Sequence, residues 1–173
     1  MTHHSDPAWP FPFDPKAYGE EAASLLQVSR LPPLGPGQPQ EEYRERLQTL
    51  RLPPVCMAGL WLYFDFLEES HRISQSLPTA EGSFWHAIMH RREPDPWNSK
   101  YWWRRVGRHP VLERLQQLAP HLGYQYTSPE AFVDFCEVVR GTGSGREELA
   151  RQVQLLEWQL LFDHCYKLNQ PPL

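Results

Sequence analysis

The segment PPVCMAGLWLYFDFLEESHRISQS (residues 53–76) is the most apolar part of the chain and decides the fold class. Leu60, Phe64 and Leu67 recur at helical spacing within it, so they predict one long helix with a buried stripe. No segment of the chain alternates apolar and polar residues for long enough to predict a strand. The sequence therefore predicts an all-α protein, built as a compact single-domain bundle of six to eight helices.

Capping and helix-breaking residues divide the rest of the chain into shorter helices. Asp95 before a proline opens one helix, and Ser144 with Glu147 makes the capping box of the last one. A Pro- and aromatic-rich arm, packed across the body or loose, is expected over residues 1–14, ahead of one helical domain over 15–173. The predicted helices cover residues 15–30, 40–51, 53–76, 83–92, 96–106, 110–118, 128–141 and 146–168.

Composition and charge limit the classes of protein to which the chain can belong. Its 173 residues, 40% hydrophobic and 13% aromatic, suffice for one domain with a sizeable core. The formal charge of −4 gives no overall basic field for nucleic acid. No apolar run could span a bilayer and no secretory signal is evident, so we expect a soluble cytoplasmic protein. The three cysteines are expected to be reduced core thiols, and they are Cys56, Cys136 and Cys165.

The buried stripe of the helix predicted over residues 53–76 continues into polar residues. At the same helical spacing it reaches His71 and then Gln75, so we expect both side chains to point inward. A buried polar group needs a partner, which must come from another segment. The opposite face is expected to be solvated and carries Asp65, Glu69 and Arg72.

The segment FWHAIMHRREPDPWNSKYWWRRVGRHP (residues 84–110) can supply such partners, because it holds three His, five Arg and four Trp. His86 and His90 are separated by about 40° around a helix axis and so share one face. With His71 they form a nitrogen-rich set that suits a divalent metal such as zinc or non-haem iron. Glu93 would be a fourth ligand or would orient one histidine. Alternatively, His71, His90 and Glu93 would act as catalytic acid and base groups.

The side chains around these histidines predict a site for a small anionic ligand. Arg binds carboxylate and phosphate groups bidentately, and aromatic side chains commonly line ligand pockets. The pattern locates a functional region and leaves open whether the protein is an enzyme. The expected ligand-binding residues are Gln75, Arg91, Arg92, Asn98, Lys100, Tyr101 and Arg105.

Each of these features also has a purely structural explanation. His71 could be a hydrogen-bonded core residue, and the charged residues from Arg91 to Asp95 could form a salt-bridge cluster at a helix corner. The tryptophans could simply pack in the core. The concentration of titratable and aromatic side chains in one short region favours a functional site.

The alternative class is a non-catalytic helical binding module. It would expose Trp97, Trp102 and Trp103 in one patch as anchors for a partner, whereas an enzyme would bury them around a pocket. The KYWWRR run (residues 100–105) could stack on single-stranded nucleic acid, but the negative net charge argues against this. A homo-oligomer is compatible with either class.

Three segments of the chain resemble a family pattern. They are Ser-His-x-Ile-x-Gln (70–75), Trp-His-x-Ile-x-His-Arg (85–91) and Asn-x-Lys-Tyr-Trp (98–102). Similar segments occur in a family of small bacterial and fungal proteins with no assigned activity. The resemblance spans residues 70–111 and implies membership of that family, without assigning a catalytic role to any residue.

Overall fold

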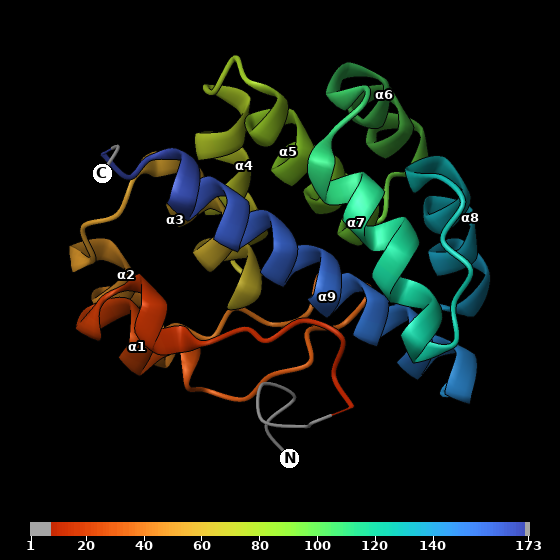
Figure 1. The fold of residues 1–173 in the computed structure, drawn as a ribbon, viewed down its shortest axis with the longest axis horizontal. Coiled ribbons are helices and arrows are strands. Elements are labelled where there is room, and N and C mark those ends of the chain that lie inside the picture. The colour runs from red at the N-terminus through yellow and green to blue at the C-terminus, as the bar shows by residue number, and fades with distance from the viewer. Residues whose placement is uncertain (1–7, 172–173) are drawn as a thin grey trace.

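The computed structural model describes residues 8–171, in which all regular structure is helical (Figure 1). This range holds nine α-helices and three short 3-10 helices and no strand, which confirms the all-α prediction. The α-helices are α1 (Glu20–Leu26), α2 (Arg44–Thr49), α3 (Pro54–Tyr63), α4 (Leu67–Gln75), α5 (Ala80–Arg92), α6 (Pro96–Val106), α7 (Pro110–Leu118), α8 (Pro129–Val139) and α9 (Gly145–Leu168). The 3-10 helices are Pro15–Tyr18, Glu41–Tyr43 and Ala119–Leu122.

α9 is the central helix of the bundle. As predicted, Ser144 caps its N-terminus, accepting a hydrogen bond from the Glu147 N–H. The reciprocal bond of the predicted capping box is not formed, because the Glu147 carboxylate accepts from the Gly141 N–H and the Ser144 N–H donates to Thr142. Residues 153–163 are all buried, so this stretch is covered on every side. α9 contacts α3, α7 and α8, and Figure 1 shows it crossing the molecule diagonally. It therefore forms the axis on which other helices bury their apolar faces.

The prediction of one helix over residues 53–76 is wrong, because the chain turns between α3 and α4. Asp65 has a left-handed backbone, with φ of 67°, which an α-helix does not contain. Its carboxylate is buried, contrary to the predicted solvated face, and lies 2.7 Å from Arg30 Nη2 and 2.6 Å from Arg92 Nη2. These guanidinium groups offset the cost of burying the charge. The division of this segment raises the helix count above the predicted range.

The described part of the N-terminal arm packs on the bundle. Phe11 and Phe13 are buried in the core, and Trp9 Nε1 donates a 2.7 Å hydrogen bond to Gln159 Oε1 on α9. Residues 8–14 thus lie across the body rather than loose. The first seven residues of the predicted arm lie outside the described residues.

The cysteines are free and buried in the core. Burial raises the pKa of the Cys56 thiol to about 12 and that of the Cys136 thiol to about 11. Thiols that stay protonated at neutral pH are poor nucleophiles, so these residues serve packing. Among the helices within residues 8–171, none combines the length and apolar character needed to cross a membrane.

α5 carries the predicted histidine pair between its neighbours α3, α4 and α6. Thr79 caps α5, so the helix begins at Ala80, earlier than predicted. α3 approaches α5 closely at Gly59, where a Cβ atom would lie only 2.5 Å from Trp85 Cζ2. Asp95 caps α6, as predicted, by accepting a hydrogen bond from the Asn98 N–H. These contacts fix how α5 sits beside α4 and α6.

Candidate metal centre

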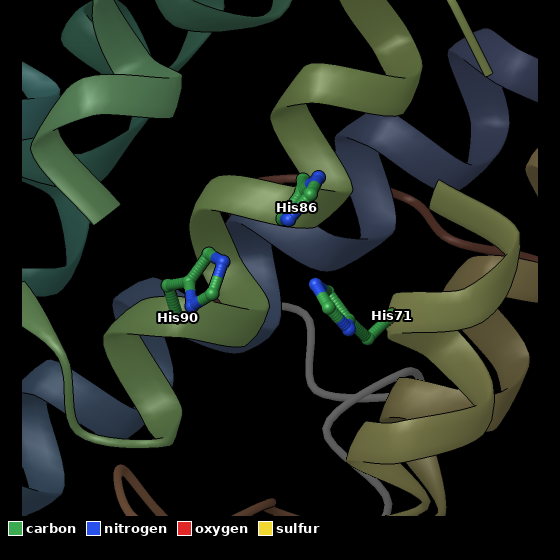
Figure 2. Close-up of side chains that lie close together, drawn as sticks. All are labelled: His71, His86 and His90. Atoms are coloured by element: carbon green, nitrogen blue, oxygen red, sulfur yellow. The ribbon is translucent and has the colours of Figure 1, made fainter. Parts of the chain in front are cut away.

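Three histidines from two helices meet beside α5. His71 projects from α4 toward His86 and His90 on α5, and Figure 2 shows one ring nitrogen of each directed into the space between them. One possible ligand atom from each residue lies within 4.8 Å of the other two. The His71 ring centroid is 4.7 Å from that of His86 and 5.3 Å from that of His90. The structure thus brings together the three metal ligands that the sequence predicts.

Glu93 fixes the ring of His90. Its Oε2 atom lies 2.5 Å from His90 Nδ1. Because an ionised carboxylate only accepts hydrogen bonds, this contact places the ring proton on Nδ1. The lone pair of Nε2 then remains for a metal ion, as in many zinc-bound histidines. Of the two roles expected for Glu93, ligand or orienting group, the geometry supports the second.

His86 is buried without a protein partner for one of its nitrogens. The residue is 3% exposed, and no described residue forms a hydrogen bond with its Nδ1 atom. The Trp102 ring stacks on it, with 3.8 Å between centroids and 17° between planes. Burial, with the neighbouring His90 and His71, lowers the pKa of His86 to about 3. Since buried polar atoms normally have partners, this neutral imidazole is suited to holding a ligand.

His71 completes the set from a half-buried position. Burial, followed by repulsion from His90, lowers its pKa, so the ring is neutral, the form that metal ions bind. A tetrahedral zinc site with Zn–N bonds of about 2.0 Å needs nitrogens about 3.3 Å apart. The three nitrogens lie at most 4.8 Å apart, so binding would require the rings to move toward one another. The residues present suit a zinc-type ion with one further position for water.

A second cluster joins three helices through Glu81, His109 and His164. Glu81 Oε1 lies 3.1 Å from Nε2 of both histidines. His109 Nδ1 accepts a hydrogen bond from the Val111 N–H, so its proton is on Nε2 and points at Glu81. Burial would raise the pKa of Glu81, but hydrogen bonds from His109, a backbone N–H and His164 together outweigh it and lower that pKa. This cluster is already satisfied internally, and His109 has no lone pair for a metal ion.

Sequence reasoning did not find this second cluster. His109 lies near the end of the segment 84–110 and has no predicted role, and Glu81 and His164 come from other parts of the sequence. Glu81, His109 and His164 are not related by any helical spacing in the sequence. Only the packing of α5, α7 and α9 brings the three side chains together.

Arg91 and Arg92, predicted as ligand-binding residues, make their contacts in the core instead. Arg91 is fully buried and pairs with Glu157, with Nη2 to Oε1 at 2.6 Å. Arg92 donates to Asp65 Oδ1 at 2.6 Å and to the Leu62 carbonyl at 2.7 Å. One and two residues after His90, they project about 100° and 200° around the helix from it. Both arginines thus form structural ion pairs, but with Glu157 and Asp65 from other segments rather than within the predicted cluster at the helix corner.

The other predicted ligand-binding residues have three different environments. Gln75 is exposed rather than pointing inward, because α4 is a separate helix that ends there. Asn98 bonds Asp95 through Nδ2 at 2.7 Å, and Lys100 forms a 2.6 Å ion pair with Asp134. Tyr101 and Arg105 are exposed on α6. Among the tryptophans, Trp103 is buried, Trp102 half-buried and Trp97 73% exposed.

Comparisons with known proteins return no match to this chain among family models, curated proteins or solved structures. The geometry of the three histidines and of the residues around them is therefore the basis for a proposed function.

Proposed function

We propose that the protein is a metal-dependent enzyme. In this proposal, His71, His86 and His90 bind one divalent ion that activates water for reaction with a small anionic molecule. The observation that carries it is the convergence of three histidine nitrogens within 4.8 Å. Cytoplasmic location and membership of the small bacterial and fungal family, both expected from sequence, belong to the same proposal.

Zinc is the ion that this ligand set favours. Non-haem iron oxygenases commonly bind iron through two histidines and one carboxylate. Here the nearest carboxylate, Glu93, is engaged by His90 Nδ1. Three neutral histidines with one open position are typical of catalytic zinc, which lowers the pKa of bound water to about 7. Glu93 would hold the proton of His90 on Nδ1 and so keep Nε2 available.

The same residues support an acid–base version of the proposal that needs no metal. His90 would exchange a proton with the substrate through Nε2, while Glu93 stabilises the charged ring. His71 would be the second acid–base group, since it approaches the same space from α4. The metal content of the protein separates the two versions.

The test is elemental analysis of untagged protein after incubation with zinc and removal of excess. We expect about one equivalent per chain, lost in the double variant His86→Ala/His90→Ala. The matched control is His109→Ala/His164→Ala, which removes two histidines from the other cluster and should keep the zinc. Absence of zinc from the wild-type protein would overturn the metal version and leave the acid–base version.

Trp97 favours a second candidate function, a helical binding module. It is 73% exposed, and Tyr101, one turn along α6, is 39% exposed, so both are placed to contact a partner. Against it, Trp103 is buried and Trp102 is stacked on His86, so the three tryptophans form no common patch. Sedimentation of wild type and Trp97→Ala would test the simplest partner, a second copy. A concentration-dependent dimer lost in the variant would support it, and a wild-type monomer would exclude that partner.

A further inference from the structure

A groove of about 560 Å³ lies between the end of α4, the start of α5 and the second half of α6. Its volume is in the range of small-molecule sites. The lining mixes apolar and polar side chains and includes Gln75, Leu77, Ser83, Trp102 and Arg105. Only one of the groove's lining residues carries a charge, and that residue is Arg105.

The walls of this groove are connected to the three histidines. Gln75 follows His71 by one turn of α4, and Ser83 precedes His86 by one turn of α5. The third wall, Trp102, stacks directly on the His86 ring. A molecule in the groove would therefore lie within one helical turn of the proposed metal ligands.

Arg105 is the residue in the groove best placed to bind an anion. Its guanidinium lies 5.3 Å from the Trp102 ring centroid and 6.0 Å from that of Tyr101. It forms no ion pair with any described residue, whereas Lys100 on the same helix pairs with Asp134. Stacking on the indole holds the guanidinium in place while its donors stay free.

Two neutral polar groups in the groove are also unengaged. No described residue forms a hydrogen bond with the Gln75 amide or with the Ser83 hydroxyl, and both belong to the lining. An amide and a hydroxyl can orient an oxygen-bearing ligand without adding charge. The apolar remainder, including Leu77 and the edge of Trp102, would cover the body of such a ligand.

We infer that this groove binds the substrate of the proposed metal centre, and that the substrate is a small carboxylic acid whose carboxylate pairs with Arg105. A single guanidinium matches the single charge of a carboxylate, whereas a phosphate monoester would leave about one negative charge unpaired. That the bound acid is a substrate rests on the proposed function. Its binding in the groove does not, because Arg105 is not one of the proposed metal ligands.

Ligand-observed NMR with phenylacetate as the probe tests the binding. Wild-type protein, with zinc and after treatment with a chelator, should bind phenylacetate in both states. Arg105→Gln should weaken binding by about tenfold, the loss expected for one charge-assisted hydrogen-bonded pair. The control Arg104→Gln removes an equally charged, exposed neighbour outside the groove lining and should leave the affinity unchanged.

The outcomes separate this inference from the proposed function. Phenylacetate binding that requires zinc and is unchanged in Arg105→Gln would mean that the carboxylate binds at the metal, which overturns the inference. Tighter binding of phenyl phosphate than of phenylacetate would overturn the choice of a carboxylate. Binding that depends on Arg105 in a protein without zinc affinity would support the groove while overturning the metal centre.

Discussion

The two histidine clusters of this protein contain similar residues, yet their nitrogens have different partners. In the second cluster, His109 Nδ1 accepts from a backbone N–H and both Nε2 atoms point at one Glu81 oxygen. In the first, the only ring nitrogen with a hydrogen-bond partner among the described residues is His90 Nδ1, and His86 Nδ1 is buried without one. Proximity of histidines is thus a weak criterion for a metal site. The position of the ring protons, set by the surrounding hydrogen bonds, decides between the two clusters.

The two clusters also join different helices. Glu81, His109 and His164 tie together the beginnings of α5 and α7 and the C-terminal half of α9, far along the chain from one another. In the first cluster, His86 stacks on Trp102, which lines the groove between α4, α5 and α6. His164 of the second cluster also lines a groove, but its nitrogen is already bonded to Glu81. We therefore interpret the second cluster as a structural junction and the first as the site of chemistry. Four predictions test this contrast.

Loss of a ligand should give the largest difference between the clusters. His90→Ala removes one proposed ligand, so zinc affinity should fall by more than the roughly 10–100-fold that follows loss of an outer-shell partner. His164→Ala should change that affinity by less than about twofold, because its nitrogen is bonded to Glu81. Competition with a chromophoric chelator measures both. An equal loss of zinc affinity in the two variants would contradict the assignment of one cluster to metal binding and the other to structure.

Loss of the carboxylate should have a smaller effect on metal binding. Glu93→Ala should weaken zinc affinity by about 10–100-fold, because His90 would no longer be held with its proton on Nδ1. Glu81→Ala is the matched variant in the other cluster and should leave zinc affinity as it is. The same competition assay applies. Unchanged zinc binding in Glu93→Ala would show that the His90–Glu93 bond has no part in metal binding.

In the metal-free protein, substitutions in the second cluster should lower stability more than substitutions in the first. His109→Ala removes the N-cap of α7 and a partner of Glu81, so the free energy of unfolding should fall by about 1–2 kcal/mol. His86→Phe replaces an unpartnered nitrogen by a ring of similar shape and should change it by less than about 1 kcal/mol. Urea titration measures both. A larger loss in His86→Phe would mean that His86 is structural.

Near neutrality, the pH dependence of stability should give the smallest effect of the four, and this effect should grow as the pH falls. The pKa of His86 is about 3 in the folded protein and about 6.5 when unfolded, so between these values the unfolded chain binds a proton that the folded protein does not. The free energy of unfolding should therefore decrease as pH falls from about 6.5 toward 3. Removing this group in His86→Phe should reduce the slope measured by urea titration from pH 7 to pH 4.

His109 provides the comparison for that slope. Burial lowers its pKa as well, which acts in the same direction, but the hydrogen bond to Glu81 opposes part of the shift. His109→Phe should therefore change the acid slope less than His86→Phe does. Equal changes in the acid slope would contradict the larger pKa shift expected for His86.

Helical spacing was sufficient to predict the three histidines. His86 and His90 lie on one face of α5 because both belong to a single uninterrupted helix. The expected proximity of His71 to this pair is confirmed although the single long helix is not, since His71 on α4 still lies 4.7 Å from His86 between ring centroids. The caps at Asp95 and Ser144 were equally readable, because capping depends on residues only three apart.

The environments of Arg91, Arg92 and Gln75 could not be read in the same way. Their placement depends on what surrounds α5 and on where α4 ends, which are properties of the assembled bundle. The partners of the two arginines, Glu157 and Asp65, are 66 and 27 residues away in the chain. Local sequence patterns contain no information about such pairings, so a charged residue that pairs in the core cannot be distinguished from one that belongs to the site.

The close approach of α3 and α5 at Gly59 limits which residues can occupy positions 59 and 85 in related chains. Because Trp85 fills the space that a side chain at residue 59 would need, the two positions should change together in related chains, with a larger residue at one accompanied by a smaller residue at the other. Trp85 is adjacent to His86, so this pair also sets the rotation of α5 that aims the histidines. A substitution at Gly59 would thus change the direction of the histidines on α5 without contacting them.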